Sequence, residues 1–506
     1  MITRREWTKM AAWWVASTWA PTRSSALFQT PRFTSDPFAL GVASGDPLPT
    51  GVVLWTRLTA DILRDNVEVD WEVASDDQMR RVVKSGRAVA TPDFAHSLHV
   101  EVNGLEPSRW YHYRFRAGGV TSPIGRTRTA PARGAPVSRL NFAFASCQHF
   151  ERGLYTAYQH LANEDIELVV FLGDYIYERA PSSGLVRRHS GGEVRTLEEY
   201  RARYAQYQSD ALLREARRLF PWVVVWDDHD VANDWAGDSP QWSKPDVNFM
   251  MRRANAAQAF YEHMPLRKAS LPDGPNIRTY RRFDYGDLAR FHMLDTRQFR
   301  SRQACGGGWK NCDDIKDPSR TMLGAAQEQW LQDGLRESPA RWNIIGNQIM
   351  MTKVDIEPGP DELFATDDWG GYDAARRRLT DFLAASRPSG PVVISGNNHY
   401  HFVGDLKSDY RDEHAPAVAT ELLGTAISST GDPRDSPFVR RWNESLRENP
   451  QVKYFLQKPG YVMCALDREI CRADFRVVPV ISTPGAPLET SARFVVENGK
   501  PGANRV

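Results

Sequence analysis

The chain has 506 residues, of which 41% are hydrophobic and 25% charged, a composition typical of a globular protein. This length suits two domains, or one large domain with a smaller companion, and it is ample for a sizeable core. Because 64 basic residues stand against 63 acidic ones, the net charge is only +1. The sequence therefore carries no nucleic-acid-binding signature, and no overall field favours an anionic membrane.

The first ten residues, MITRREWTKM, place Arg4 and Arg5 before the short, modestly apolar stretch AAWWVASTWA. Paired arginines before a weakly hydrophobic segment are typical of a bacterial twin-arginine export signal. The stretch is too short to stay as a membrane-spanning helix, so no transmembrane segment is expected. We predict that residues 1–35 are a leader read by the twin-arginine export machinery, which makes the protein periplasmic or secreted. The alternative is a frayed, Trp-rich leader with chance arginines.

The five cysteines form two close pairs and one single residue. CGGGWKNC and CALDREIC share the spacing C-x6-C, and in an exported protein each could close a local disulfide. The pairs would be Cys305 with Cys312 in a Gly-rich loop, and Cys464 with Cys471 across a hairpin. Cys147 is left over as inert filler, a half-disulfide or a metal ligand.

Residues 36–131 look all-β. Alternating segments such as GVVLWTRL and RWYHYRFRAG are separated by turn residues at spacings that suit a small fibronectin- or immunoglobulin-like β-sandwich. In VNGLEPSRWYHYRF, Tyr111 and Tyr113 are placed as in a tyrosine corner. The alternative is that both are ordinary strand aromatics, which leaves the architecture unchanged. The segment 131–138, PARGAPVS, is the expected linker.

Residues 138–480 have the sequence pattern of an α/β domain. Apolar strands such as LNFAFAS, LVVFLGD, WVVVWDD and PVVISGNN alternate with helical stretches such as TLEEYRARYAQYQ and AARRRLTDFLAAS. Continuous apolar strands with intervening helices indicate sheets that are covered by helices. Residues 481–506 are expected to add one strand and a loose tail.

Nearly every strand of this domain ends in a side chain that could bind a metal. Ligands of α/β sheets bind beyond the carboxyl ends of the strands, so these endings point to one site. The candidates are Cys147 after LNFAFAS, Asp174 and Tyr177 after LVVFLG, Asp228 and His229 after VVVW, Asn347 after WNIIG, and Asn397, His399 and His401 after PVVISG.

Each ending alone has an ordinary explanation. An Asp after a strand is most often a turn former or a helix cap, and histidines also make plain hydrogen bonds. The segment WDDHD is more telling, because its three carboxylates repel one another and a cation would stabilise them. In the segment HYH (399–401), successive side chains of an extended backbone would point to opposite sides, so the two imidazoles would point to the same side.

The donor types indicate both the metals and the reaction. Thiolate and phenolate suit Fe(III), whereas carboxylate and amide oxygens suit Ca(II), Mg(II) or Mn(II). A mixed cluster fits phosphoester hydrolysis, because metals bind nonbridging oxygens, lower the pKa of a bound water and stabilise the leaving charge.

Several stretches resemble one known family. DPFALGVASGDPLPTGVVLWTRL, ASCQ, FLGDYIYE, VWDDHDVANDW, LDTRQFR and GNQIMM are similar, in this order, to motifs of the alkaline phosphatase D (PhoD-like phosphatase and phosphodiesterase) family. The resemblance covers nearly the whole chain after residue 35. It implies a fibronectin-like domain followed by a metallophosphoesterase domain of four α/β/β/α layers. It also implies twin-arginine export and a centre of Fe(III) with Ca(II), with manganese, zinc or magnesium as alternative metals.

The resemblance also implies a role for each matching residue. Cys147 would be the thiolate ligand of iron and Tyr177 its phenolate ligand, and Asp174 would bridge the metals. Asp228 stands where metallophosphoesterases use a metal-binding Asn. His229 would hydrogen-bond a phosphoryl oxygen or protonate the leaving group.

Two further positions keep alternatives open. Arg297 would clamp phosphate bidentately or form a salt bridge to a neighbouring carboxylate. Where the family reads approximately SGDVH, this chain has Asn397 in place of the anionic ligand. A neutral amide there would weaken metal binding, shift the metal preference or make the bound water less basic. His399 and His401 could compensate as metal ligands.

The sequence thus predicts an exported, metal-dependent phosphoester hydrolase that uses a metal-activated hydroxide on small-molecule or polymeric phosphoesters. The alternative is a non-catalytic or weakly active phosphoester-binding relative, which Asn397 favours.

Overall fold

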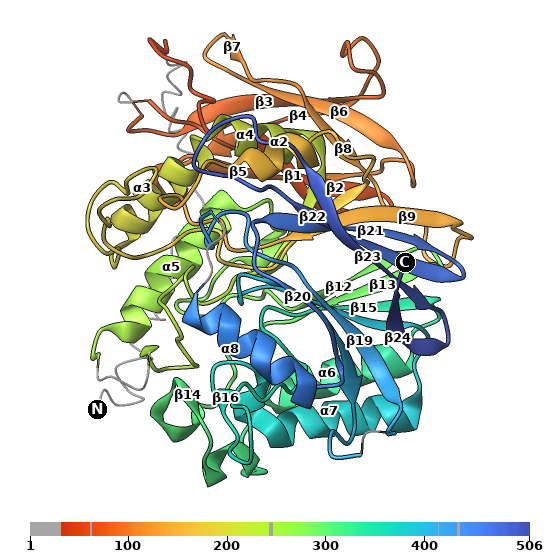
Figure 1. Cartoon of the computed structure of the whole chain (residues 1–506). Coiled ribbons are helices and arrows are strands. Elements are labelled where there is room, and N and C mark those ends of the chain that lie inside the picture. Colours follow the sequence, from red (N-terminus) through yellow and green to blue (C-terminus); the bar gives the residue numbers. More distant parts are fainter. Residues whose placement is uncertain (1–31, 61–62, 242–245, 413, 433–435) are drawn as a thin grey trace, which may run out of the picture.

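The computed structural model describes residues 32–506 except 61–62, 242–245, 413 and 433–435, so most of the predicted export leader lies outside the described residues. Two large β-sheets share an apolar core, and helices pack on their outer faces (Figure 1). The mixed α/β class predicted from the sequence is confirmed. Among the described residues, no helix combines the length and the apolar character needed to cross a membrane.

The larger sheet has ten strands. In spatial order they are β24 (Lys500–Arg505), β23 (Glu489–Glu497), β22 (Ile470–Val477), β21 (Gly460–Asp467), β9 (Arg139–Ala145), β10 (Leu168–Phe171), β11 (Pro221–Val224), β1 (Val42–Leu48), β2 (Gly51–Arg57) and β5 (Ser97–Asn103). The neighbours β9, β10, β11 and β1 run parallel. Parallel strands are covered on both faces, which explains why these segments are almost continuously apolar.

The second sheet has seven strands. Their order is β12 (Arg281–Tyr285), β13 (Ala289–Met293), β15 (Trp342–Gly346), β17 (Pro391–Ser395), β19 (Ala417–Leu423), β18 (His401–Lys407) and β20 (Val452–Leu456). Apolar side chains of both sheets meet between them; for example, the rings of Phe142 in β9 and Phe291 in β13 lie edge to face with centroids 5.2 Å apart.

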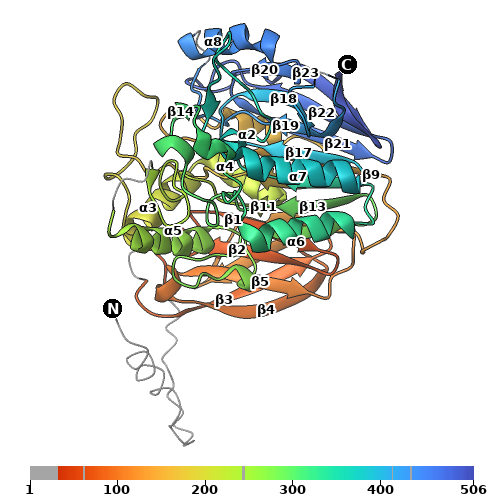
Figure 2. The ribbon, with the colours of Figure 1, turned by 90° about the horizontal axis from the view of Figure 1, so that it is seen from below.

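Helices cover the outer faces of both sheets. Against the ten-stranded sheet pack α2 (Thr156–Leu161), α3 (Leu197–Gln208), α4 (Ala211–Leu219) and α5 (Phe249–His263). Against the seven-stranded sheet pack α6 (Gly324–Arg336) and α7 (Asp373–Ser386), which face the viewer in Figure 2. The remaining elements are α8 (Pro437–Ser445), the pair β14 (Trp309–Lys310) and β16 (Phe364–Ala365), and short 3₁₀ helices at Pro92–Phe94, Lys268–Ser270, Ala304–Gly306, Asp313–Lys316, Trp369–Tyr372 and Leu446–Glu448.

The N-terminal region contributes to two sheets at once. Strands β4 (Val82–Ala90), β3 (Val67–Ala74), β6 (Trp110–Ala117) and β7 (Val120–Thr121) form a sheet in this order, and β8 (Gly125–Arg128) pairs with β6. This sheet shares a core with β1, β2 and β5 of the ten-stranded sheet. The backbone N–H of Glu106 donates to the Tyr111 hydroxyl (2.9 Å), which is the hydrogen bond of the predicted tyrosine corner.

Strand β1 binds the N-terminal region to the rest of the chain. It runs parallel to β11, with Ser44 opposite Pro221. Asp46 of β1 accepts from the Arg281 guanidinium of β12 (2.8 Å), which also donates to the Val224 carbonyl of β11 (2.8 Å). One arginine therefore ties the N-terminal region to both large sheets.

Two predictions about the end of the chain are wrong. Cys464 and Cys471 are free thiols, whereas Cys305 and Cys312 form the predicted disulfide. In the hairpin of β21 and β22, Cys464 lies opposite Ala473 and Cys471 opposite Leu466, so the two thiols are diagonal neighbours rather than a facing pair. The predicted loose tail is also absent: β24 pairs with β23 and forms the edge of the ten-stranded sheet.

Candidate active site

The strand ends named in the sequence converge because β9, β10 and β11 run parallel and side by side. The chain leaves these strands at Cys147, Asp174 and Asp228, while β17 of the second sheet leads into His399. Cys147, Asp174, Asn397 and His399 have φ angles of +58°, +56°, +62° and +59°. Left-handed backbone is uncommon outside glycine and clusters at functional sites.

The Tyr177 hydroxyl lies at the centre of the first group of ligands. It donates to Asp174 Oδ2 (2.9 Å), and His399 Nε2 (3.1 Å) and Ser429 Oγ (2.7 Å) are also within hydrogen-bond distance. Single ligand atoms of Cys147, Asp174 and His399 lie within 4.8 Å of one another. Predicted ligands from three strand ends therefore meet around one phenol.

A second group of ligands shares Asp174 with the first. Ligand atoms of Asp174, Asp228 and His229 also lie within 4.8 Å of one another. Asp228 Oδ2 accepts the backbone N–H of Asp234 (2.8 Å), whereas its buried Oδ1 has no hydrogen-bond partner among the described residues. This Oδ1 lies 3.8 Å from Arg297 Nη2, and a carboxylate oxygen that is free of hydrogen bonds beside a shared carboxylate suits a cation site.

The electrostatics of the site fit a bound cation. Burial raises the pKa of the Cys147 thiol and that of the Asp174 carboxyl, and the Asp228 carboxylate raises the pKa of Asp174 further. Burial alone would raise the pKa of Asp228, but the positive charges of Arg297 and His229 outweigh burial and lower this pKa. A metal ion would hold thiol and carboxyl in their anionic forms at this depth. The residues present therefore fit a metal centre.

His229 is held by a carboxylate that the sequence analysis did not assign. Its Nδ1 lies 2.6 Å from Oε2 of Glu178, and its ring stacks on Tyr177 with centroids 4.0 Å apart. Burial acts to lower the pKa of His229, but the charges of Glu178, Asp228 and Asp174 outweigh it and raise this pKa to about 10. The signal in the sequence was the charged end of GDYIYE, where Glu178 directly follows Tyr177.

Arg297 forms the salt bridges that are the alternative to a phosphate clamp, and its role as a clamp stays a prediction. Its Nε donates to Asp227 Oδ1 (2.5 Å) and its Nη1 to Asp367 Oδ1 (2.9 Å). The residue is fully buried and does not line the pocket of the site. The guanidinium instead neutralises the negative charge of the carboxylates beneath the site.

His401 does not join the ligand groups found among the described residues, and its role as a ligand stays a prediction. It lies in β18, where its Nδ1 accepts the backbone N–H of Thr425 (3.2 Å) and its Nε2 lies 3.3 Å from the Arg476 carbonyl. The predicted alternation fails because His399 precedes the strand in a left-handed conformation. Asn397, also in a left-handed turn, stays a predicted ligand.

A pocket of about 270 Å³ opens above these groups. It is lined by His149, Arg152, Tyr177, Arg179, His229, Asn233, His399, Ser429, Thr430 and Gln457. The sequence analysis assigned no role to the arginines, to His149 or to the Ser429–Thr430 segment. His149 and Arg152 follow Cys147 closely, whereas Ser429 and Thr430 lie in a loop without any chemical signature in the sequence.

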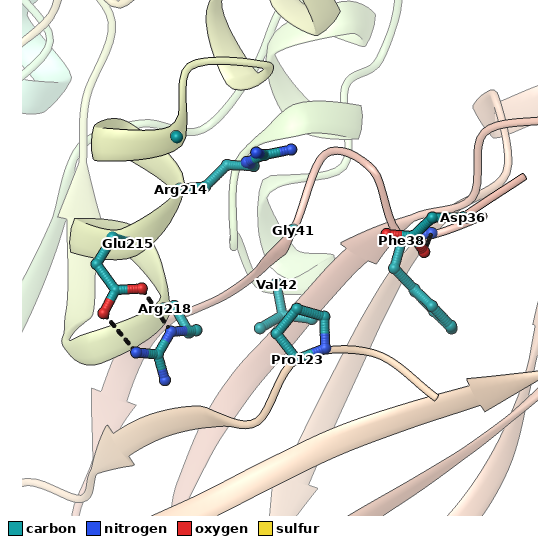
Figure 3. A pocket seen from close by; sticks show the side chains of 9 residues that line it. Asp36, Phe38, Gly41, Val42, Pro123, Arg214, Glu215 and Arg218 are labelled. Atoms are coloured by element: carbon teal, nitrogen blue, oxygen red, sulfur yellow. Dashed lines mark hydrogen bonds and ion pairs between the residues drawn. The ribbon is translucent and has the colours of Figure 1, made fainter. Parts of the chain in front are cut away.

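The described chain has another hollow, between α4 and the start of β1 (Figure 3). Its arginines already have partners: Arg218 Nε donates to Glu215 Oε2 (2.8 Å), and Arg214 donates to the Ala39 carbonyl. It holds none of the ligands described above.

Comparison with known proteins agrees with this geometry. The family model "PhoD-like phosphatase" matches residues 142–475, and the model of the N-terminal domain of PhoD-like phosphatases matches residues 22–131. The chain is 44% identical over 488 residues to alkaline phosphatase D of Bacillus subtilis (strain 168), covering 94% of this chain and 83% of that protein.

A solved structure of PhoD superposes with a TM-score of 0.91 at 44% identity, covering 94% of this chain and 93% of the other. A second match is GAP50, the anchor in the inner membrane complex of Plasmodium, which covers 72% of this chain and 90% of the other. Its TM-score is only 0.38 at 11% identity, too low to indicate a shared fold. The chain belongs to the PhoD-like phosphatase family. It is an enzyme, a phosphoester hydrolase.

Proposed function

We propose that the protein is an exported, metal-dependent alkaline phosphatase and phosphodiesterase whose reaction takes place in the pocket above Asp174. One observation carries the proposal: Asp174 lies within 4.8 Å of Cys147 and His399 on one side and of Asp228 on the other, as expected for a carboxylate that bridges two cations. Similarity to alkaline phosphatase D of Bacillus subtilis supports the substrate class.

The donor types divide the two groups between two kinds of metal. Cys147, Tyr177 and the shared Asp174 suit Fe(III), with His399 beside them, whereas Asp174, Asp228 and the amide of Asn397 suit Ca(II). When bound, these ions supply positive charge for the phosphoryl oxygens and lower the pKa of a water at the site. Manganese, zinc and magnesium are alternatives for the second position.

His229 is the proposed proton donor. Glu178 holds its Nδ1, so Nε2 is the ring nitrogen left to face a substrate in the pocket that His229 lines. A charged imidazole there donates a proton to the leaving alkoxide or a hydrogen bond to a phosphoryl oxygen. The Tyr177 ring stacked on it fixes the orientation of the imidazole.

We also propose the layer order of the two domains and an export route for the protein. The order of helices, two facing sheets and further helices supports a metallophosphoesterase α/β/β/α domain, and the N-terminal sheets with the Tyr111 hydrogen bond support a β-sandwich. Arg4 and Arg5 support twin-arginine export to the periplasm or the medium. We propose domain limits of 36–131 and 138–480.

The test is turnover of bis-p-nitrophenyl phosphate and p-nitrophenyl phosphate by the purified protein with Fe and Ca added. We expect hydrolysis that chelation abolishes and re-addition of both metals restores. Absence of turnover with both metals bound, together with retained phosphoester binding, would instead establish a non-catalytic binding protein.

A further inference from the structure

Ser429 and Thr430 lie in the loop that follows β19, and both line the pocket. This loop runs beside the end of β9. The backbone N–H of Ile427 donates to the Ser146 carbonyl (3.0 Å), and that of Ser429 donates to the Cys147 carbonyl (3.2 Å). A segment that follows the seven-stranded sheet is thereby fixed against a predicted iron ligand that follows the ten-stranded sheet.

The Ser429 hydroxyl contacts two predicted iron ligands at once. Its Oγ lies 2.6 Å from the Cys147 carbonyl oxygen and 2.7 Å from the Tyr177 hydroxyl oxygen. It also accepts the backbone N–H of His149 (3.1 Å). The side chain is buried, and hydrogen bonds are stronger in such surroundings than in water. One small hydroxyl therefore links the backbone beside the thiol ligand to the phenol ligand.

Among the described residues, three polar side chains lie within hydrogen-bond distance of the Tyr177 hydroxyl. Two of them, Asp174 Oδ2 (2.9 Å) and His399 Nε2 (3.1 Å), are themselves predicted metal ligands. The third is Ser429, which carries a proton and is not a predicted ligand. A phenolate bound to a metal can only accept hydrogen bonds, so Ser429 is the member of this group that remains able to donate one.

The single proton of the Ser429 hydroxyl has two acceptors within reach, the Cys147 carbonyl and the Tyr177 oxygen. A phenolate is the stronger acceptor, because hydrogen bonds to an ionised group are about twice as strong as those between neutral groups. Turning the hydroxyl toward Tyr177 leaves no orphaned carbonyl, since the backbone N–H groups of Ser428 (3.4 Å) and Ser429 (3.2 Å) also donate to Cys147. The hydroxyl can therefore turn at little cost once Tyr177 is bound as a phenolate.

We propose that Ser429 is a positioning residue of the iron site, which donates a hydrogen bond to the Tyr177 phenolate and so sets the orientation and the electron density of this ligand. The inference rests on the proposed function, in which Tyr177 binds Fe(III). Hydrogen bonds from outside the ligand shell orient metal ligands, and those to an anionic ligand tune the metal that it binds. Ser429 thus acts on the reaction through Tyr177 and needs no contact with the substrate.

The test compares S429A, S429T and S428A in the iron-loaded protein. Ser428 is the matched control, because its buried hydroxyl donates to the His149 carbonyl (2.9 Å) in the same loop. Within the described ranges, no hydrogen bond joins the Ser428 hydroxyl to Tyr177. S429T keeps a hydroxyl group at the position under test. Thermal melting confirms that each variant is folded, and the readout is the absorption band from charge transfer between the phenolate and Fe(III).

In S429A we expect this band to move to longer wavelength, because the filled phenolate orbital loses the hydrogen bond that stabilises it. Iron should also bind about tenfold more weakly in competition with a chelator, a typical cost of losing a partner of a metal ligand. S428A should keep the wild-type band and affinity, and S429T should restore the band position. An unchanged band in S429A overturns the proposal. So does an equal shift in S428A, which would reduce Ser429 to a packing role.

Turnover and zinc binding separate this inference from the proposed function. If the wild type hydrolyses bis-p-nitrophenyl phosphate and the band of S429A is unchanged, the inference alone fails. If the iron-loaded wild type has no such band, Tyr177 is not an iron ligand and that part of the proposed function fails. Zn(II) competition with a chromogenic chelator then tests Ser429: about tenfold weaker binding in S429A, with wild-type affinity in S428A, supports the positioning role, and equal affinity in S429A and wild type overturns it.

Discussion

His229 and Glu178 form a buried pair in which Nδ1 lies 2.6 Å from Oε2. The pair fixes the orientation of the imidazole and keeps it charged over most of the accessible pH range. Its two members come from separate strand ends, since Glu178 follows β10 and His229 follows β11. The adjacent parallel strands are therefore what brings a carboxylate to the histidine.

The charge of His229 predicts a pH dependence of stability in metal-free protein. Because the folded-state pKa of about 10 exceeds the usual 6.5, the contribution is complete below pH 6.5 and is lost as pH rises through about 10. In E178Q the amide carries no charge, so the folded-state pKa of His229 falls; the loss still begins near pH 6.5, but it is smaller and is complete at a lower pH. Urea denaturation between pH 6 and 10 measures this, with E198Q on the exposed face of α3 as control. Identical pH profiles for E178Q and wild type would contradict the assignment.

Cys147 and Asp174 are expected to control metal content. C147A should lose most of the bound iron, and D174N should lose both metals, because Asp174 belongs to both ligand groups. Metal analysis of the purified proteins checks this, and phosphodiesterase activity should fall in parallel. C464A is the control, since Cys464 is a buried free thiol in β21. Unchanged iron and full activity in either variant would remove the proposed centre.

Arg297 is expected to act on stability rather than on phosphate binding. R297Q leaves Asp227 without its arginine, whereas Asp367 keeps Arg300, and breaking such a buried pair costs about 3–5 kcal/mol in the free energy of unfolding. Urea denaturation measures the loss, and R297K should recover part of it. A raised KM with unchanged stability would return Arg297 to the role of a phosphate clamp.

The thiols can be counted directly. In unfolded but unreduced protein, alkylation should label Cys147, Cys464 and Cys471 and leave Cys305 and Cys312 linked. Removing the disulfide with C305S/C312S should cost about 2.5 kcal/mol, the loop-closure value for eight residues. Peptide mass spectrometry identifies the labelled positions, and a Cys464–Cys471 crosslink would contradict the structure.

Asn397 is expected to limit metal affinity. N397D adds a negative oxygen at the position where the family has an anionic ligand, so calcium should bind about tenfold more tightly. The substitution suits the backbone, because Asp tolerates the left-handed conformation found at this residue. Calcium titration of apo-protein measures the change, with N398D as the neighbouring control. Equal affinity in N397D and wild type would place the side chain outside the metal centre.

The strand-end residues were predictable because the carboxyl ends of neighbouring parallel strands lie at the same edge of the sheet. A residue that directly follows such a strand is therefore placed at that edge. Cys147, Asp174 and Asp228 followed from apolar runs and their polar endings alone. His401 and Arg297 did not, since the left-handed turn at His399 and the carboxylates around Arg297 depend on tertiary packing. The pairing of Cys464 with Cys471 failed for a similar reason: the hairpin was predicted, but its register was not.

The parallel pairing of β1 with β11 has a consequence for how the protein unfolds. Removing residues 36–131 would expose the edge of β11 and leave Arg281 without Asp46. Although separate family models match the two regions, they should melt in a single calorimetric transition. The N-terminal region thus completes the hydrogen bonding of β11, the strand that leads to Asp228, so damage to this region is expected to reach the active site.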